Sequence, residues 1–247
     1  MNLPFEQFPA LSAVGICRHV FTQRIPGIDP APARHDKAEV LQRLDAAHRE
    51  IRNAIGVADW PLFTAEQIHG NKIAIASHVV AARRWVDSCS RSAVGREFPG
   101  CDGLITNQRG VALGVYVADC CAVYIVDPKT PAIGLVHSGR KGTELGVVTN
   151  AIKQMIDRFG SEPANMIVLL SPCIRPSHYE IDFPAEIVRQ CRTLGVKEIH
   201  DSGICTACDL NRYYSYRAEK GKTGRMLALI GLTRQFGIRR KNVRCAR

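Results

Sequence analysis

The sequence contains no apolar run near the length that a membrane-spanning helix needs, no low-complexity tract and no internal repeat. Residues 1–21, MNLPFEQFPALSAVGICRHVF, lack the basic start, unbroken apolar core and small-residue cleavage site of a secretory signal peptide. We therefore expect a cytoplasmic protein without a membrane anchor. In that compartment, ten cysteines predict reduced thiols or metal ligands rather than a disulfide framework.

Signatures of nucleic-acid binding are also missing. The chain has 33 Lys and Arg against 23 Asp and Glu, a formal net charge of +10, which favours anionic partners such as nucleic acid, a phosphorylated metabolite or inorganic phosphate. However, it has no ribonucleoprotein aromatic motif, no zinc-finger spacing and no basic heptad array. We therefore do not predict nucleic-acid binding, and we leave the oligomeric state open.

Hydrophobic periodicity predicts a mixture of helices and strands in one domain over residues 1–247. Expected helices cover residues 37–56, 143–160, 186–195 and 222–237. Expected strands lie within residues 62–76, 103–106, 111–128, 131–137 and 166–172. Strands and helices do not alternate strictly, so the pattern does not favour a doubly wound parallel sheet.

Three side chains of the kind that bind metals lie at strand ends or in glycine-flanked turns: His69 in QIHG, Cys120 in VADCC and His137 in GLVHSGRKG. Catalytic zinc is commonly held by three such ligands with a fourth position open. Taken singly, a histidine beside glycine is more often a turn residue, and a cysteine in a strand a small core residue. Cys120 and His137 would also suit a cysteine hydrolase, in which an imidazole generates a thiolate nucleophile.

Asp119 interrupts an apolar, β-branched run, VADCCAVYIV. An ionised carboxylate is costly to bury unless it meets a cation, a metal-bound imidazole or several hydrogen-bond donors. We therefore expect Asp119 to have a partner nearby.

Two further segments carry polar groups of interest. In GLVHSGRKGTELG, a strand, a tight turn and a helix start predict a phosphate cradle of backbone N–H groups with Ser138, Arg140 and Lys141; an ordinary turn with solvated basic residues is the alternative. CTAC at residues 205–208 lacks a second CxxC, so we expect a packing role rather than a redox pair or part of a zinc site.

Six segments in order resemble the laccase-domain family, also called polyphenol oxidase-like or multicopper-oxidoreductase-like, whose members are regarded as purine nucleoside phosphorylases. The segments are FTQR, QIHG, CDGLITNQRGVALGVYVADCCAVYIVDP, IGLVHSGRKGT, SPCIRPSHYEID and CTACDLNRYYSYRAEKGKTGRMLALI. All six segments in this order identify the family far more specifically than any one of them does. The resemblance implies an α+β fold with layered α/β/β/α architecture and mixed β-sheets, related to cysteine-hydrolase-like toxins.

The resemblance also implies a function and a site. It implies phosphorolysis of adenosine, inosine and methylthioadenosine, with adenosine deaminase side activity, at a zinc ion held by His69, Cys120 and His137 but not by Cys121. Arg24 matches the early arginine of the family and is the first candidate for contacting phosphate or the base. Our hypothesis for the carboxylates is that Asp102 or Asp119 orients ligands or transfers a proton. Ser138, Arg140 and Lys141 depart from the family motif H-A-G-W-R-G, and Lys141 lacks the bidentate fork of arginine.

The oxidase names of the family imply copper chemistry that the histidines do not support. A multicopper oxidase needs a trinuclear cluster rich in paired imidazoles, whereas this chain has eight histidines and no His-x-His pair. We therefore expect zinc as the cofactor, with copper entering the same ligands adventitiously in vitro, and not a polyphenol oxidase (laccase) mechanism.

Overall fold

The computed structural model describes residues 3–28, 37–77 and 96–234, which build two mixed six-stranded sheets. The first sheet has the order β1 (Phe5–Glu6), β2 (Cys17–Thr22), β12 (Met226–Leu232), β7 (Ala112–Val117), β3 (Leu62–Ala65) and β5 (Arg96–Phe98). The second has the order β11 (Glu198–Asp201), β10 (Ile167–Leu170), β8 (Cys121–Asp127), β9 (Ala132–Ser138), β6 (Gly103–Thr106) and β4 (Ile73–Ile75). The predicted α+β class with mixed sheets is confirmed.

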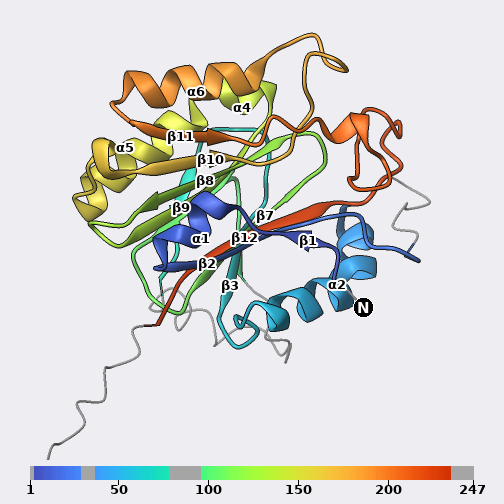
Figure 1. Cartoon of the computed structure of the whole chain (residues 1–247), viewed down its shortest axis with the longest axis horizontal. Coiled ribbons are helices and arrows are strands. Elements are labelled where there is room, and N and C mark those ends of the chain that lie inside the picture. The colour runs from blue at the N-terminus through green and yellow to red at the C-terminus, as the bar shows by residue number, and fades with distance from the viewer. Residues whose placement is uncertain (1–2, 29–36, 78–95, 235–247) are drawn as a thin grey trace, which may run out of the picture.

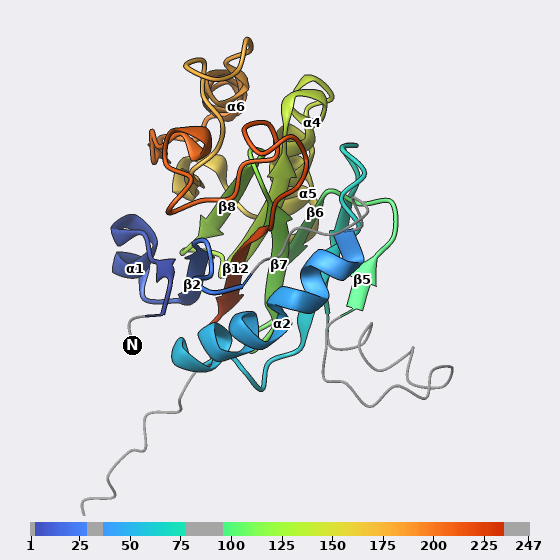
Figure 2. The ribbon, with the colours of Figure 1, turned by 90° about the vertical axis from the view of Figure 1, so that its right-hand side faces the viewer.

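The helices lie outside the two sheets (Figures 1 and 2). α2 (Lys37–Ala54) buries one apolar face in the same core cluster as the first sheet. On the second sheet, α5 (Val147–Phe159) packs against β4, β6 and β9, and α4 (Arg140–Glu144) and α6 (Phe183–Thr193) pack beside it. The short helix α1 (Pro9–Val14) contacts β2, and 3-10 turns cover Pro163–Asn165 and Thr206–Cys208.

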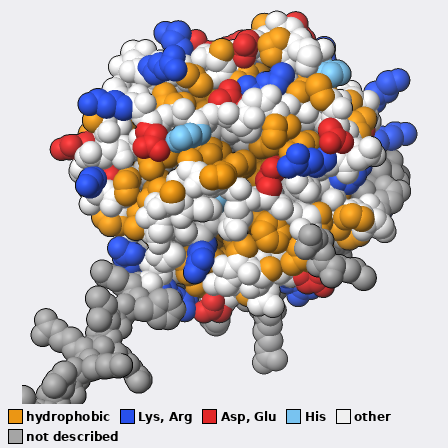
Figure 3. All heavy atoms as spheres, in the orientation of Figure 1, with side chains coloured by type: hydrophobic (Ala, Val, Ile, Leu, Met, Phe, Trp, Pro, Cys, Tyr) orange, Lys and Arg blue, Asp and Glu red, His pale blue; other side chains and the backbone are white. Residues whose placement is uncertain are grey.

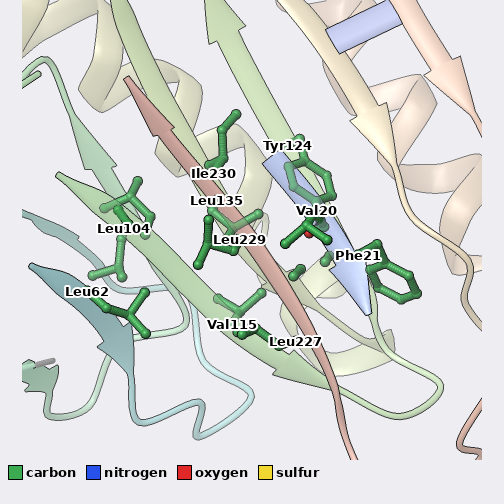
Figure 4. Close-up of a cluster of buried hydrophobic side chains, with 14 of the residues drawn as sticks. Val20, Phe21, Leu62, Leu104, Val115, Tyr124, Leu135, Leu227, Leu229 and Ile230 are labelled. Carbon is green, nitrogen blue, oxygen red and sulfur yellow. The ribbon is translucent and has the colours of Figure 1, made fainter. Parts of the chain in front are cut away.

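The main core fills the space between the sheets. Figure 4 shows Val115 and Leu229 of the first sheet in one buried cluster with Leu104, Tyr124 and Leu135 of the second. Tyr124 is fully buried, and its hydroxyl donates to the carbonyl of Val20 at 2.8 Å, so its polar atom is satisfied across the sheet interface. This packing fixes one sheet against the other, and with it the strand ends that carry the candidate ligands.

The predicted helix at residues 222–237 is wrong. Its apolar run instead forms β12, which pairs with β2 and β7 in the first sheet; residues 235–237 lie outside the described part of the chain. All seven residues of β12 are buried, and a short run that is apolar on every face fits a central strand as well as a helix. A Cβ at Gly231 would lie 2.7 Å from the carbonyl of Val111, so glycine permits this close approach.

The other helices agree with the sequence except in their bounds. α2 and α6 fall within two or three residues of the expected ranges. The expected helix 143–160 is two helices, α4 and α5, because Gly146 adopts a left-handed conformation with φ of +70°. Asp182 caps α6 by accepting from the backbone N–H of Ala185 at 3.1 Å.

The described surface carries charge of both signs. On the face shown in Figure 3, Lys and Arg side chains are interspersed with Asp and Glu and with apolar groups. Among the described residues, no helix combines the length with the apolarity that a membrane crossing requires.

Candidate metal centre and active site

His69, Cys120 and His137 come together in space. His69 follows a strand of the first sheet and His137 belongs to a strand of the second, 68 positions later in the sequence. His69 lies in the turn after β3, Cys120 lies between β7 and β8, and His137 lies near the end of β9. Their ligand atoms all lie within 4.8 Å of one another. Cys120 Sγ is 3.9 Å from His69 Nε2, and the two imidazole centroids are 4.8 Å apart at an interplanar angle of 77°.

Asp102 organises two of these three residues. It is fully buried, and its Oδ1 accepts from the backbone N–H of His69 at 2.8 Å while Oδ2 accepts from that of Gly70 at 2.7 Å. Oδ1 also lies 3.0 Å from His137 Nδ1. A proton on that Nδ1 leaves Nε2 of His137 as the atom available to a metal. Burial opposes the charge of Asp102, but the hydrogen bonds from His137 and Gly70 lower its pKa.

The electrostatics favour a thiolate at Cys120. Burial opposes its charge, but the charge and hydrogen bond of His137, and then those of His69, lower the pKa of Cys120 to about 6. Burial likewise opposes the imidazolium of His137, yet Cys120 and Asp102 raise the pKa of His137 to about 9. Without a metal, the site therefore holds a thiolate–imidazolium pair between about pH 6 and pH 9.

This pair predicts a pH dependence of thiol reactivity in the metal-free protein. We expect iodoacetamide alkylation of Cys120, followed by peptide mass spectrometry, to rise with a midpoint near pH 6 rather than near the ordinary thiol pKa of 9. Because the pKa of Cys120 is lowered on folding, its contribution to stability disappears as the pH falls through 6. Because that of His137 is raised, its contribution disappears as the pH rises through 9. Between pH 6 and pH 9 the contribution of Cys120 grows while that of His137 falls, so the two groups together are expected to add little net pH dependence to unfolding in urea. An alkylation midpoint near 9 would contradict the pairing.

Gly139, between β9 and α4, lets the backbone pass against the thiol. A Cβ at this position would lie 2.5 Å from Cys120 Sγ, too close for the thiol to keep its place. Gly139→Ala is therefore expected to reduce the affinity of the site for a divalent metal about 10- to 100-fold, the range typical for changes around metal ligands, as measured by competition with a chelator. Gly142→Ala is the matched control, because its nearest contact is the Gly70 carbonyl at 3.4 Å and it lies within α4. Equal affinities for the two variants would show that Gly139 is not needed for the site.

The three side chains open onto a cleft with a volume of about 450 Å³. Its basic side chains are Lys37, Arg140, Arg217 and Arg225. Its aromatic side chains are Tyr116, Tyr179, Phe183 and Tyr216. The cleft thus offers flat apolar surfaces and positive charge beside the candidate metal ligands, which suits a ligand with both a ring and an anionic group.

The backbone around the cleft is unusual. Gln67, His69 and Asp119 all line it, and all have positive φ angles, of 65°, 61° and 84°. Non-glycine residues seldom adopt this conformation, and when they do they are often found at functional sites. The side chain of Gln67 holds its segment to β7, because its amide donates to the carbonyl of Tyr116 at 2.6 Å and accepts from the N–H of Tyr116 at 3.0 Å.

Asp119 has the nearby partners that its burial requires. Its Oδ1 accepts from the hydroxyl of Thr206 and its Oδ2 from the backbone N–H of Arg217, both at 2.7 Å. These donors come from the segment after β11. Asp119 therefore joins that segment to the strand end that carries Cys120, whereas the carboxylate that orients the imidazole of His137 is Asp102.

The structure does not bring Arg24 to the cleft wall. Its guanidinium pairs with Glu219 at 2.8 Å, donates to the carbonyl of Tyr213 at 3.1 Å and lies 4.4 Å from the ring centroid of Tyr214. These contacts hold the segment that carries Tyr216. The phosphate contact expected of Arg24 stays a prediction and would require it to leave Glu219.

Only one of the three side chains expected to form the phosphate cradle lines the cleft. Arg140 does, although it also pairs with Glu144 at 2.9 Å. Ser138 is fully buried, and its hydroxyl lies 2.8 Å from that of Thr143. Lys141 is exposed and is not among the cleft-lining residues. The structure also places Cys121 in the core, with its thiol donating toward the carbonyls of Ala122 and Ser171.

The cleft includes residues that the sequence did not single out. Arg225 precedes β12 and is half-buried; Tyr179 follows β10, and Tyr216 lies in the loop before β12. All three belong to segments of the family resemblance. Arg225 was missed because a helix was predicted over residues 222–237. That prediction placed Arg225 on a helix, whereas it directly precedes strand β12.

Most of the chain matches the model of a known protein family. The family model described as multi-copper polyphenol oxidoreductase laccase matches residues 18–187 and 178–233. The chain belongs to this family. The resemblance found in the sequence is therefore confirmed.

Relatives and a solved structure agree with this laccase-like family. A purine nucleoside phosphorylase of Deinococcus radiodurans is 28% identical over 267 residues, covering 96% of this chain and 96% of the relative. One of Corynebacterium glutamicum is 27% identical over 249 residues, covering 88% of this chain and 95% of the relative. The crystal structure of Bacillus licheniformis protein YfiH is 21% identical, covers 94% of this chain and 97% of its own, and has a TM-score of 0.78, so the two share a fold.

Proposed function

We propose that this protein is a zinc-dependent purine nucleoside phosphorylase that converts adenosine, inosine or methylthioadenosine and phosphate into the free base and a sugar 1-phosphate. The main support for this proposal is structural. His69, Cys120 and His137 converge in a cleft that is also lined by aromatic and basic side chains. The names of the relatives support the same reaction.

The ligand set fits zinc. Zinc–sulfur bonds of about 2.3 Å and zinc–nitrogen bonds of about 2.1 Å in a tetrahedron place sulfur and nitrogen about 3.6 Å apart; Cys120 Sγ and His69 Nε2 are 3.9 Å apart. One thiolate with two imidazoles is a set that catalytic zinc uses, and it would leave a position open. When bound there, zinc would supply Lewis acidity for an oxyanion or for an attacking water.

We assign the base and the phosphate to different side chains of the cleft. Tyr179 and Tyr216 offer rings against which a purine can stack. Arg225 is the candidate for phosphate, because within the described residues it donates only to the carbonyls of Thr223 at 3.3 Å and Gly224 at 2.8 Å. By contrast, Arg140 pairs with Glu144 and Arg217 with Glu180. Arg225 therefore has guanidinium N–H groups left for an anion.

Replacing Arg225 with methionine tests this assignment. The variant is expected to raise the KM for phosphate roughly tenfold or more, since a hydrogen bond to a charged group contributes about 1.5–3 kcal/mol. Nucleoside binding is expected to change little, as measured by titration without phosphate. Arg189→Met is the control, because Arg189 is exposed on α6 and pairs with Glu186. An unchanged KM for phosphate in Arg225→Met would remove Arg225 from phosphate binding.

The carboxylates have positioning rather than proton-transfer roles in this proposal. Both oxygens of Asp102 accept hydrogen bonds from the backbone of the His69 turn, and both oxygens of Asp119 accept from Thr206 and Arg217. Adenosine deaminase side activity uses the same zinc and cleft. Because water replaces phosphate as the nucleophile, it is expected to persist without phosphate.

A second candidate is a cysteine hydrolase using Cys120 and His137. It is favoured by the arrangement of Cys120 beside His137, whose imidazole Asp102 orients at 3.0 Å; this surrounding lowers the pKa of Cys120 to about 6. Metal analysis separates the two functions, because a hydrolase of this kind would be active without metal. The polyphenol oxidase implied by the family name gains no support from the single sulfur and two imidazoles of this site.

The reaction class is tested by product analysis. Zinc-loaded protein is incubated with adenosine, inosine or methylthioadenosine, with and without phosphate, and the products are separated by chromatography. Free base and sugar 1-phosphate that appear only with phosphate support phosphorolysis, and inosine formed from adenosine supports deamination. Free base formed equally without phosphate, or no turnover of any nucleoside, would overturn the proposal.

A further inference from the structure

A second cluster of metal-binding side chains lies outside the site described above. His178 is in the loop between β10 and α6, while Cys205 precedes the 3-10 turn after β11 and Cys208 is its last residue. His178 Nδ1 lies 3.6 Å from Cys205 Sγ and 3.5 Å from Cys208 Sγ, and the three ligand atoms lie within 4.8 Å of one another. Cys205 is buried, whereas His178 and Cys208 are exposed.

We propose that His178, Cys205 and Cys208 form a second zinc site, separate from that of His69, Cys120 and His137. The bond lengths of zinc to sulfur and nitrogen predict a sulfur–nitrogen separation of about 3.6 Å in a tetrahedron, and both observed separations match it. Two thiolates with one imidazole form a soft ligand set that selects zinc over magnesium or calcium. Three protein ligands leave the fourth position for water on the exposed side.

The two loops hold the ligands in place without a metal. The N–H of Cys173 donates to the carbonyl of Ile204 at 3.1 Å, and the N–H of Thr206 donates to the carbonyl of Cys173 at 3.2 Å. The N–H of His178 donates to the carbonyl of Arg175 at 2.8 Å. A site built from such fixed backbone requires little ordering when the ion binds.

The packing role expected for CTAC explains only part of this geometry. Burial suits Cys205 as a core residue, but Cys208 is exposed and an imidazole lies against both sulfurs. A Cys205–Cys208 redox pair would leave the position of His178 unexplained. The sequence does not reveal this site, because its third ligand, His178, lies 27 positions before Cys205, in SPCIRPSHYEID.

The position of the second site indicates what it does. Thr206, between the two cysteines, donates to Asp119, which precedes Cys120 of the first site. Tyr179, next to His178, lines the cleft, and its ring centroid lies 5.1 Å from the guanidinium carbon of Arg217. An ion at the second site would therefore clamp two loops that form one wall of the cleft. We assign it a structural role.

Metal counting on the full chain tests the proposal independently of the proposed enzyme activity. After reduction, zinc loading and gel filtration, elemental analysis is expected to find two zinc ions per wild-type chain and one each in Cys120→Ser and Cys208→Ser. His178→Gln, an exposed change, is expected to repeat the loss seen in Cys208→Ser, and Cys17→Ser is the thiol control. Equal zinc content in wild type, Cys208→Ser and His178→Gln would overturn the second site, whatever Cys120→Ser shows.

Two further measurements use Cys120→Ser, in which the second of the two proposed sites is kept intact. Added zinc is expected to raise its melting temperature, and this rise is expected to vanish in Cys120→Ser/Cys208→Ser, with folding of both checked by circular dichroism. Cobalt in Cys120→Ser is expected to give a thiolate charge-transfer band that the double variant lacks. A zinc-independent melting temperature, or a Cys205–Cys208 disulfide found by mass spectrometry in the reduced, zinc-loaded protein, would overturn the proposal.

Discussion

Replacing Cys120 with serine is expected to lower the proposed phosphorolysis of inosine about 1000-fold and to remove the zinc ion proposed to bind His69 and His137. A serine hydroxyl does not ionise near neutral pH and is a weak zinc ligand, whereas the neighbouring imidazoles lower the pKa of the Cys120 thiol to about 6. Metal catalysis contributes several kcal/mol, and each 1.36 kcal/mol is a factor of ten in rate. The measurement is kcat/KM with zinc content determined on the same preparation.

Cys17→Ser is the matched control for this prediction. Cys17 is a buried thiol that donates to the carbonyl of Leu11, a bond that a hydroxyl can also make, and it lies outside both clusters. It is expected to keep its zinc and its turnover. If Cys120→Ser loses turnover but keeps the full zinc content of the wild type, Cys120 acts as a nucleophile rather than a ligand. If it keeps full turnover, neither function assigned to Cys120 holds.

Asp102→Asn is expected to have the second-largest effect, a loss of about 10- to 100-fold in zinc affinity and turnover. An asparagine amide has one acceptor oxygen, whereas Asp102 accepts from the N–H groups of His69 and Gly70 through different oxygens. In either orientation, its NH₂ group would face a backbone donor. A buried donor without an acceptor costs about 1–3 kcal/mol, so the free energy of unfolding is also expected to fall.

Asp127→Asn separates this effect from the general cost of changing a buried aspartate. Asp127 ends β8 and is fully buried, but one oxygen alone accepts both of its backbone donors, the N–H groups of Lys129 and Thr130. An asparagine can keep that oxygen in place. Turnover and zinc affinity of Asp127→Asn are therefore expected to match wild type. Urea unfolding and chelator competition measure both variants, and equal zinc affinities would contradict the orienting role of Asp102.

The sequence predicted the candidate ligands better than their surroundings. His69, Cys120 and His137 lie in segments of the family resemblance, and the strand ends and turns that carry them could be identified locally. The structure brings these three together. It also distinguishes the two carboxylates, which the sequence left as equal candidates. That distinction depends on contacts between segments far apart in the chain, such as Asp119 with Thr206, 87 residues later.

The errors have a common physical cause, the dependence of local structure on distant partners. Met226–Leu232 is apolar throughout, and its strand conformation follows from pairing with β2 and β7 rather than from its own periodicity. Arg225 was missed because its place at the cleft depends on that pairing. Likewise, Arg24 looked available for phosphate because its partner, Glu219, is 195 residues away.

The most direct test of a single divalent ion shared by His69, Cys120 and His137 is anomalous diffraction at the zinc absorption edge from crystals of active protein. We expect an anomalous peak at bonding distance from Cys120 Sγ and from one imidazole nitrogen each of His69 and His137. Active crystals without a peak between these three side chains would contradict it.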